Sequence, residues 1–126
     1  MRRTEIHASR ALLTALVATF SATPAFAATV VCGGTVAQVS YENAYVLLRL
    51  SNMNTPAMIC HLDVNFEVAP GYVTSPAACK VMYASFLAAK LSGATLNNVY
   101  FDGPAIPASC AAWAPWTYAH VRHYEM

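Results

Sequence analysis

Four cysteines set the strongest limit on the structure of this chain, and they are Cys32, Cys60, Cys79 and Cys110. An even number of cysteines in a small exported chain is typical of a disulfide framework. No two of them are separated by only two residues, so their spacing does not match the C-x-x-C pattern of metal sites. The sequence therefore predicts two disulfides, with four unpaired thiols or a metal site as the alternative.

Four cysteines permit three connectivities, and sequence alone does not decide among them. We favour Cys32–Cys110 together with Cys60–Cys79. The first would tie the two ends of the domain together, and the second would close a loop between a strand and the helix after it. In the chain-entropy model each link stabilises the fold by roughly 3–4 kcal/mol, which matters for a small domain with a modest core.

The first 27 residues have the pattern of a secretory signal peptide. Three arginines lie within the first ten residues, an uncharged and mostly apolar run follows over residues 11–20, and an A-x-A site ends at Ala27. Ten residues form about 15 Å of helix, roughly half of a bilayer core, so an uncleaved anchor is the weaker interpretation. We therefore expect a signal over residues 1–27 and one secreted or periplasmic domain over residues 28–126, not inserted in the membrane.

The charge of the chain changes once the signal is set aside. The whole sequence is 57% hydrophobic and 10% charged, with a net charge of +1. Residues 28–126 keep four basic and five acidic side chains, so their net charge is −1. The apolar content argues against intrinsic disorder, and the charge argues against nucleic acid or an anionic membrane as a partner.

Hydrophobic periodicity predicts a mainly β domain with one helix. Apolar and polar residues alternate over residues 58–68, which is typical of a strand with one buried face. The adjacent glycines Gly33 and Gly34 predict a bulge or sharp bend in an earlier strand. The other expected strands are residues 30–41, 45–50, 95–101 and 117–125.

The expected helix begins after Ser75, which can cap it, and has Pro76 at its first position. Gly93 is suited to end the helix in the left-handed conformation. Apolar residues recur at helical spacing and predict a core-facing stripe, formed by Cys79, Met82, Tyr83, Phe86 and Leu87.

This element order, β-β-β-α-β-β, is that of a small OB-type barrel, and we expect one such domain held by two disulfides. A generic α+β sheet with one covering helix is the alternative. The sequence contains no internal repeat, low-complexity tract or second domain.

An exported chain of this size and element order, with a cysteine pair joining its ends, resembles the B subunits of bacterial AB5 toxins of the subtilase-cytotoxin and typhoid-toxin type. The matching positions are Cys32, Ile59-Cys60, the helix over 76–92 and the strand over 95–101. These B subunits form pentameric rings and bind host glycans, so the resemblance implies a homo-oligomer with a glycan ligand, without assigning sugar-contacting residues. Small secreted bacterial proteins of unknown function are also similar, through residues 32–36 and 99–101.

Two polar strand faces are candidate binding sites. On the strand over 58–68, one face presents His61, Asp63, Asn65 and Glu67, which can meet an ion or sugar hydroxyls. Asp63 and Glu67 would lie about 13 Å apart along the strand, farther than glycosidase carboxylates, so a solvated face is the main alternative.

The last strand presents aromatic and hydrogen-bonding side chains on one side, and Trp113 and Tyr100 can extend them. Aromatic rings beside polar groups suit the C–H faces of sugars, and they also suit protein interfaces. Packing of these rings into the core is the alternative. The residues of this face are Trp116, Tyr118, His120, Arg122 and Tyr124.

No catalytic motif is present, and paired cysteines would leave no thiolate nucleophile. We expect a binding module for a glycan or a protein, without cofactor or metal, rather than an enzyme. The alternatives are an inhibitor of a hydrolase that acts through the loop over 102–115, and a small exported hydrolase that uses His61 with Asp63 or Glu67.

Overall fold

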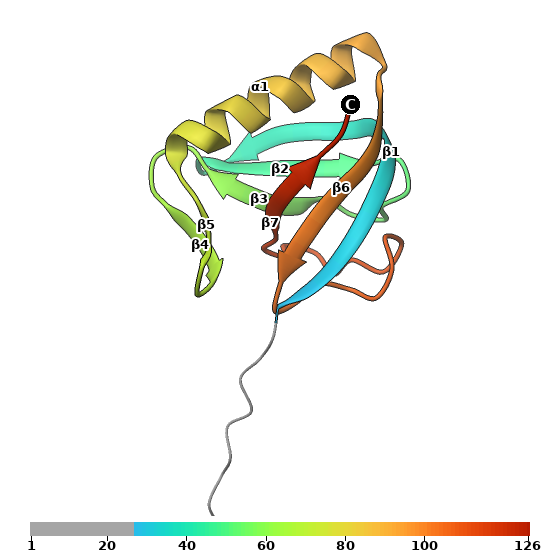
Figure 1. Cartoon of the computed structure of the whole chain (residues 1–126). Helices are drawn as coiled ribbons and strands as arrows, with labels where there is room; N and C mark the ends of the chain where they lie inside the picture. The colour runs from blue at the N-terminus through green and yellow to red at the C-terminus, as the bar shows by residue number, and fades with distance from the viewer. Residues whose placement is uncertain (1–26) are drawn as a thin grey trace, which may run out of the picture.

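A computed structural model describes residues 27–126, so the predicted signal peptide lies outside the described residues except for Ala27. The described part is mainly β with one helix, as expected (Figure 1). In chain order, the elements are β1 (Ala28–Glu42), β2 (Tyr45–Leu50), β3 (Ala57–His61), β4 (Phe66–Ala69), β5 (Tyr72–Thr74), α1 (Pro76–Ser92), β6 (Thr95–Gly103) and β7 (His120–Tyr124).

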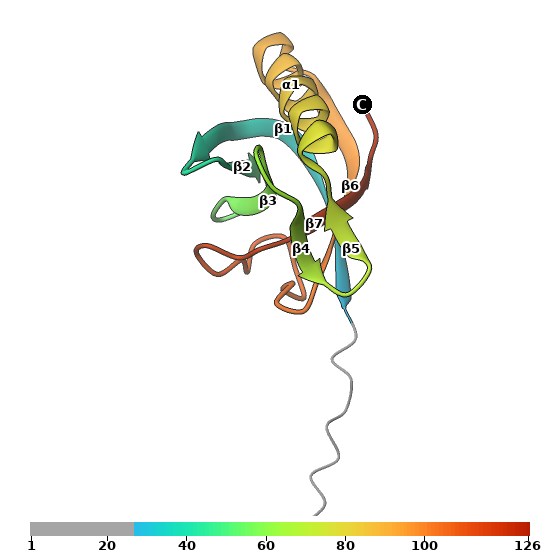
Figure 2. The same cartoon turned by 90° about the vertical axis from the view of Figure 1, so that its left-hand side faces the viewer.

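Five strands form one antiparallel sheet in the order β3-β2-β1-β6-β7, and β4 and β5 form a separate hairpin. Figures 1 and 2 show the sheet as strongly curved, with α1 lying across one end of it. The core fills the space between the helix and the inner face of the sheet. Its largest fully buried side chains include Phe86, Phe101, Leu48, Leu50, Ile59 and Leu96.

The strand β1 bends at Gly33 and Gly34, which confirms the expected irregularity. Its first half pairs with β6 and its second half with β2, and the register with β6 shifts between Cys32 and Gly34. A Cβ atom on Gly33 would lie 2.6 Å from the carbonyl oxygen of Asn97. Gly34 has a φ of +123°, a conformation that side-chain-bearing residues rarely adopt. These two glycines allow β1 to bend, so that it pairs with β6 along its first half and with β2 along its second half.

The sheet is not closed into a barrel, and the expected element order is wrong. The edge strand β3 meets the segment that precedes β7 through a single parallel bridge between Met58 and Tyr118. There the Met58 N–H donates to the Thr117 carbonyl and the Ala119 N–H donates to the Met58 carbonyl, both at 2.9 Å. The strand β7 begins only at His120, where the chain already pairs with β6. An additional hairpin, β4–β5, also precedes the helix.

The strand expected over residues 58–68 is divided into β3 and β4. The His61 side chain explains the break, because its Nδ1 accepts hydrogen bonds from the backbone N–H groups of Asp63 and Val64, at 3.1 and 3.3 Å. This turn diverts the chain after β3. Polar and apolar residues continue to alternate through this turn, so the periodicity of the sequence does not reveal the turn.

The helix α1 begins and ends as the sequence predicts. The Ser75 Oγ accepts a hydrogen bond from the Ala78 N–H, and Gly93 ends the helix with a φ of +69°. The buried residues are Cys79, Met82, Phe86 and Ala89, whereas Leu87 is exposed and the prediction that it faces the core is wrong. In the described part of the chain, no helix is long and apolar enough to cross a membrane.

Two disulfides are present, Cys32–Cys110 and Cys60–Cys79, in the pairing that the sequence favours. The first joins β1 to the loop between β6 and β7, and the second joins β3 to α1. Disulfides persist in oxidising compartments, so this protein belongs to an extracytoplasmic environment.

Candidate functional site

The predicted face of the last strand is divided in the structure. Trp116 lies in a turn with a φ of +62°, before β7 begins. Tyr118 forms the bridge to β3, and Arg122 lies at a register shift between β6 and β7. Tyr124 packs against Phe86 of the helix, with ring centroids 4.8 Å apart. The five residues therefore do not form one face, because the turn and the bulge break the alternation.

A different set of rings forms one cluster, which we call the aromatic surface. Tyr118 stacks on Tyr45 with centroids 5.7 Å apart, and Tyr45 meets His61 edge to face at 4.7 Å. Phe66 packs edge to face against Tyr118 at 5.5 Å. The structure thus joins His61 and Tyr118, which the sequence placed on separate faces. We define the aromatic surface as this cluster of Tyr45, His61, Phe66 and Tyr118 together with the exposed Trp116, which lies two residues before Tyr118 in the chain.

Sequence reasoning did not assign Tyr45 and Phe66 to a site. Tyr45 pairs with His61 across β2 and β3, so its ring bridges the two predicted positions. The available signal was an aromatic residue at the start of one strand and a histidine at the end of the next. Placing the two opposite each other requires the register of β2 and β3, which the sequence does not give. Trp113 was expected to extend the site, but it is 2% exposed and packs against Phe101 in the core.

Three hydrogen bonds fix the turn that carries Trp116. Asn54 accepts from the Trp113 N–H at 2.8 Å and donates to the Trp113 carbonyl at 2.9 Å. The Thr117 hydroxyl donates to the Ala114 carbonyl at 2.8 Å. Trp116 nevertheless remains 57% exposed. A left-handed tryptophan fixed by surrounding bonds is an unusual conformation of the kind that clusters at functional sites.

A small cavity of about 160 Å³ lies beside Trp116. Leu47 forms part of its wall, and Leu47 is two residues from Tyr45 along β2, on the same side of that strand. The cavity therefore adjoins the aromatic surface. Its lining residues are Leu47, Thr55, Pro56, Pro115 and Trp116.

The hydroxyl of Tyr118 is engaged by its neighbour. A side-chain hydrogen bond with Tyr45 raises the pKa of Tyr118 above its ordinary value of 10.0, and the charge of Tyr45 and burial act in the same direction. The phenol is therefore protonated at physiological pH. With Tyr118 47% exposed, the pair offers hydroxyl groups at the edge of a stacked aromatic surface.

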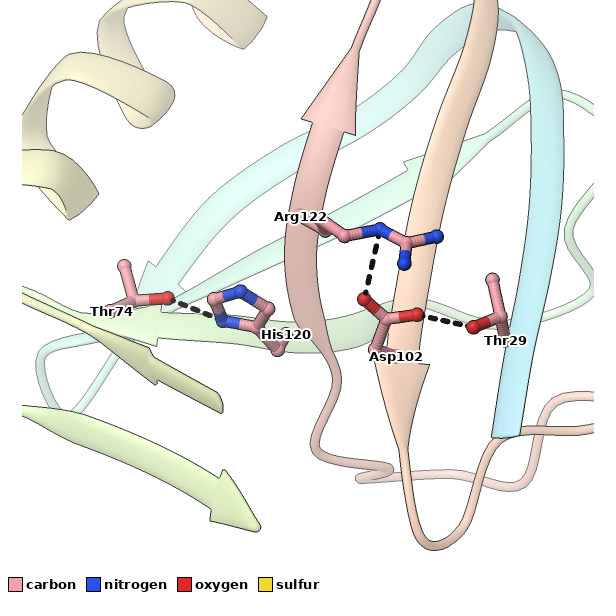
Figure 3. A network of polar contacts seen from close by, with 5 residues as sticks. All are labelled: Thr29, Thr74, Asp102, His120 and Arg122. Carbon is pink, nitrogen blue, oxygen red and sulfur yellow. Dashed lines mark hydrogen bonds and ion pairs between the residues drawn. The ribbon is translucent and has the colours of Figure 1, made fainter. Parts of the chain in front are cut away.

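A separate polar network lies on β6 and β7 (Figure 3). Asp102 is 1% exposed, accepts a hydrogen bond from the Thr29 hydroxyl and pairs with the Arg122 Nε at 3.4 Å. Figure 3 shows the Arg122 side chain reaching across β6 toward Asp102, whereas His120 points the other way, toward Thr74. The Thr74 hydroxyl lies 3.1 Å from the His120 Nδ1. The sequence did not single out Asp102 or Thr74, because their burial depends on the sheet.

Burial is the main influence on His120. It lowers the pKa of His120 below 6.5, while the charge of Asp102 acts to raise the pKa and that of Arg122 acts to lower it. His120 is therefore neutral at pH 7 and joins the β4–β5 hairpin to β7. This arrangement is a structural link between elements, since Thr74 is itself 4% exposed and not accessible as a nucleophile.

The first predicted polar face does not converge on a ligand. His61 accepts two backbone hydrogen bonds in the turn after β3, whereas Asp63 lies exposed within the break between β3 and β4 and Glu67 lies exposed on β4. Within residues 27–126, no group of three or more His, Cys, Asp or Glu side chains is arranged to hold a metal ion.

A larger open groove, of about 500 Å³, lies between α1 and β7. The helix contributes mostly small or apolar side chains, and the strand contributes four consecutive residues. The lining residues are Ala77, Ala78, Val81, Met82, Val121, Arg122, His123 and Tyr124. No family model, curated protein or solved structure matches this chain, so the surfaces themselves carry the functional argument.

Proposed function

We propose that this protein is an exported, disulfide-stabilised glycan-binding module that acts through the aromatic surface. The observation that carries the proposal is Trp116, which is 57% exposed although the turn around it is fixed by hydrogen bonds. A rigid aromatic side chain loses little conformational entropy on binding. Keeping a tryptophan exposed in this way has no benefit for folding, since its apolar ring remains in water.

The chemistry of the surface suits a sugar ring. The C–H face of a pyranose stacks on the Trp116 indole, and its hydroxyls meet the polar edge formed by Tyr118 and Tyr45. The cavity of about 160 Å³ is smaller than the roughly 300–1,000 Å³ of most small-molecule pockets. It therefore accommodates one substituent of a sugar, while the rest of the glycan lies on the open surface.

Tryptophan fluorescence gives a direct test, because the chain has two tryptophans and they differ in environment. Trp116 is exposed, whereas Trp113 is 2% exposed. A glycan array should identify ligands for the wild type and not for Trp116→Ala, and a bound glycan should protect Trp116 from quenching by iodide. Tyr41→Ala, at a residue 64% exposed outside the aromatic surface, is the matched control. Equal glycan binding by wild type and Trp116→Ala would refute the proposal.

We also propose a distant relation to the OB-type plan of the toxin B subunits, although the sheet is not closed. The strand β1 pairs with both β2 and β6, and the β3 edge bridges the segment leading into β7 at Met58 and Tyr118. OB folds are partly open five-stranded barrels. We propose on this basis, and on the two disulfides, a secreted or periplasmic protein that assembles into a ring of identical subunits. Light scattering of residues 28–126 tests the ring, and a strict monomer would exclude it.

A second candidate function is inhibition of a hydrolase. The loop between β6 and β7 is fixed at Cys110 by its disulfide to β1 and at Trp113 by Asn54. A loop fixed in this way binds a partner with little loss of entropy. Capture of a hydrolase that is abolished by substitutions in residues 104–112, and unaffected by Trp116→Ala, would favour inhibition over glycan binding.

A further inference from the structure

The outer edge of β7 is accessible in the groove beside α1. The sheet ends at β7, and among the described strands only β6 forms a ladder with it. Four consecutive residues of this strand, from Val121 to Tyr124, line the groove. The side chains of Val121 and Tyr124 pack on the core side of β7, whereas those of Arg122 and His123 lie beside Tyr100 on its outer side, so all four can border one groove only along the edge. The groove therefore contains the hydrogen-bonding edge of β7.

The backbone groups that face this edge can be assigned from the ladder. The Glu125 N–H donates to the Asn98 carbonyl at 3.0 Å, and the Glu125 carbonyl accepts from the Asn97 N–H at 3.1 Å. In an antiparallel pair, groups directed toward the neighbour and groups directed away from it alternate along the strand. The N–H and carbonyl of Tyr124 therefore point away from β6, toward the groove.

The two sides of this edge differ in chemistry. On the inner side, α1 presents Val81 and Met82, which are apolar, and Val81 is 64% exposed. On the outer side, the Arg122 guanidinium lies 5.4 Å from the Tyr100 ring centroid, and the His123 ring lies 5.8 Å from it. Arg122 contacts Asp102 through Nε alone and its side chain is 55% exposed. No acidic side chain lines the groove, but the Glu125 carboxylate just beyond it lies 3.4 Å from the His123 Nε2, so Arg122 supplies the positive charge of the groove.

We propose that this groove binds an extended segment of a partner protein as an additional strand beside β7. Alternate side chains of the segment are apolar, facing α1, and acidic, facing Arg122. Strand addition of this kind derives affinity from main-chain hydrogen bonds and specificity from alternate side chains, and opposite charges on neighbouring strands are favourable. Contact between Thr74 and His120 closes one end, so the paired part spans about four residues, or roughly 13 Å.

The occupant is a protruding segment of another protein rather than a second copy paired edge to edge. Because α1 borders the β7 edge in every copy, a second copy paired there would bring its own helix to the groove beside the first. Such pairing would also bring the Arg122 side chains of the two copies to one joint, where like charges on neighbouring strands are unfavourable. An acidic extended segment meets neither obstacle.

The test uses a fluorescent synthetic peptide in which valine and glutamate alternate, with residues 28–126 of the protein. We expect a submillimolar Kd by anisotropy, and NMR shift changes concentrated in the amides of residues 121–124. A peptide methylated at alternate backbone nitrogens keeps its side chains but cannot pair with β7, and it should bind at least about tenfold more weakly. A peptide alternating valine and lysine should bind more weakly as well.

Two helix variants provide the matched comparison. Val81→Glu places a negative charge in the groove and should reduce binding of the valine–glutamate peptide at least about tenfold. Leu91→Glu makes the same change at a residue 80% exposed on the same helix but outside the groove, and should have no effect. Circular dichroism confirms that both variants fold.

Four results would overturn the proposal. They are no saturable binding of the valine–glutamate peptide, equal binding of its methylated form, equal binding of the valine–lysine peptide, or equal loss in Val81→Glu and Leu91→Glu. Self-association that shifts the amides of residues 121–124 without peptide would identify a second copy as the occupant and would also reject the proposed segment.

Discussion

Replacement of Arg122 by methionine tests the buried ion pair that joins β7 to β6. Methionine keeps an unbranched apolar side chain beside Tyr100 but removes the partner of Asp102, which is 1% exposed. The Asp102 Oδ2 has no hydrogen-bond partner besides this ion pair. Arg122→Met therefore leaves a carboxylate oxygen that neither water nor protein satisfies.

The expected loss follows from that geometry. A hydrogen bond to a charged group contributes about 1.5–3 kcal/mol, and the exposure of Arg122 reduces the electrostatic part. We expect Arg122→Met to lower the free energy of unfolding by about 2 kcal/mol, equivalent to a decrease in Tm of about 8–16 °C for a domain of this size. Urea unfolding followed by circular dichroism at pH 7 measures it.

A double variant separates loss of charge pairing from loss of packing. Asp102→Asn in the Arg122→Met background removes the buried charge and should recover at least about 1 kcal/mol of the loss. Arg49→Met removes a cation that takes part in neither of the ion pairs in the described part of the chain, and should change stability by less than about 0.5 kcal/mol. If the double variant is no more stable than Arg122→Met, an unpaired buried charge is not the cause.

Three further predictions concern the fold. In urea titrations, Gly34→Ala should lower the free energy of unfolding by about 2–3 kcal/mol, because the new Cβ would meet the Ser51 side chain. Gly71→Ala, at a position with positive φ but open space around it, should lower it by only about 1 kcal/mol. Equal losses in the two variants would contradict the close approach of Ser51 to Gly34. Joint replacement of Cys32 and Cys110 by alanine should lower it by about 4–5 kcal/mol under the chain-entropy model for a separation of 78 residues, and unchanged stability would reject that model here. Burial lowers the pKa of His120 in the folded state, so the contribution of His120 to stability is complete above pH 6.5 and decreases as the pH falls from 6.5 toward the lowered pKa. His120→Gln should therefore reduce the dependence of Tm on pH below 6.5. An unchanged dependence would assign it to other groups.

The sequence was most informative where a local rule decides the structure. Ser75, Pro76 and Gly93 bound the helix because capping, proline geometry and left-handed φ are properties of single residues and their close neighbours. Gly33 and Gly34 marked the bend in β1 for the same reason. The preferred disulfide pairing also followed from local order, since Cys60 and Cys79 lie on consecutive elements of the predicted strand–helix unit.

The sequence was least informative where contacts between distant segments decide the structure. Periodicity predicted one strand through His61 and Asp63, but the His61 imidazole forms a turn there. Periodicity also placed Trp116 and Tyr124 on one face, whereas the backbone turn at Trp116 and the packing of Tyr124 on the helix separate them. A two-residue repeat reports alternation only while the backbone remains extended.

By itself, the sequence determined the composition of the domain: an export signal is predicted, two disulfides are formed, and one capped helix follows a run of strands. Tertiary structure alone decided that the sheet stays open, that Asp102 is buried, and that Tyr45 joins His61 to Tyr118. The physical reason is the distance along the chain between the residues that interact. Caps, turns and glycine conformations act within a few residues, whereas burial and strand register depend on segments far apart in the chain.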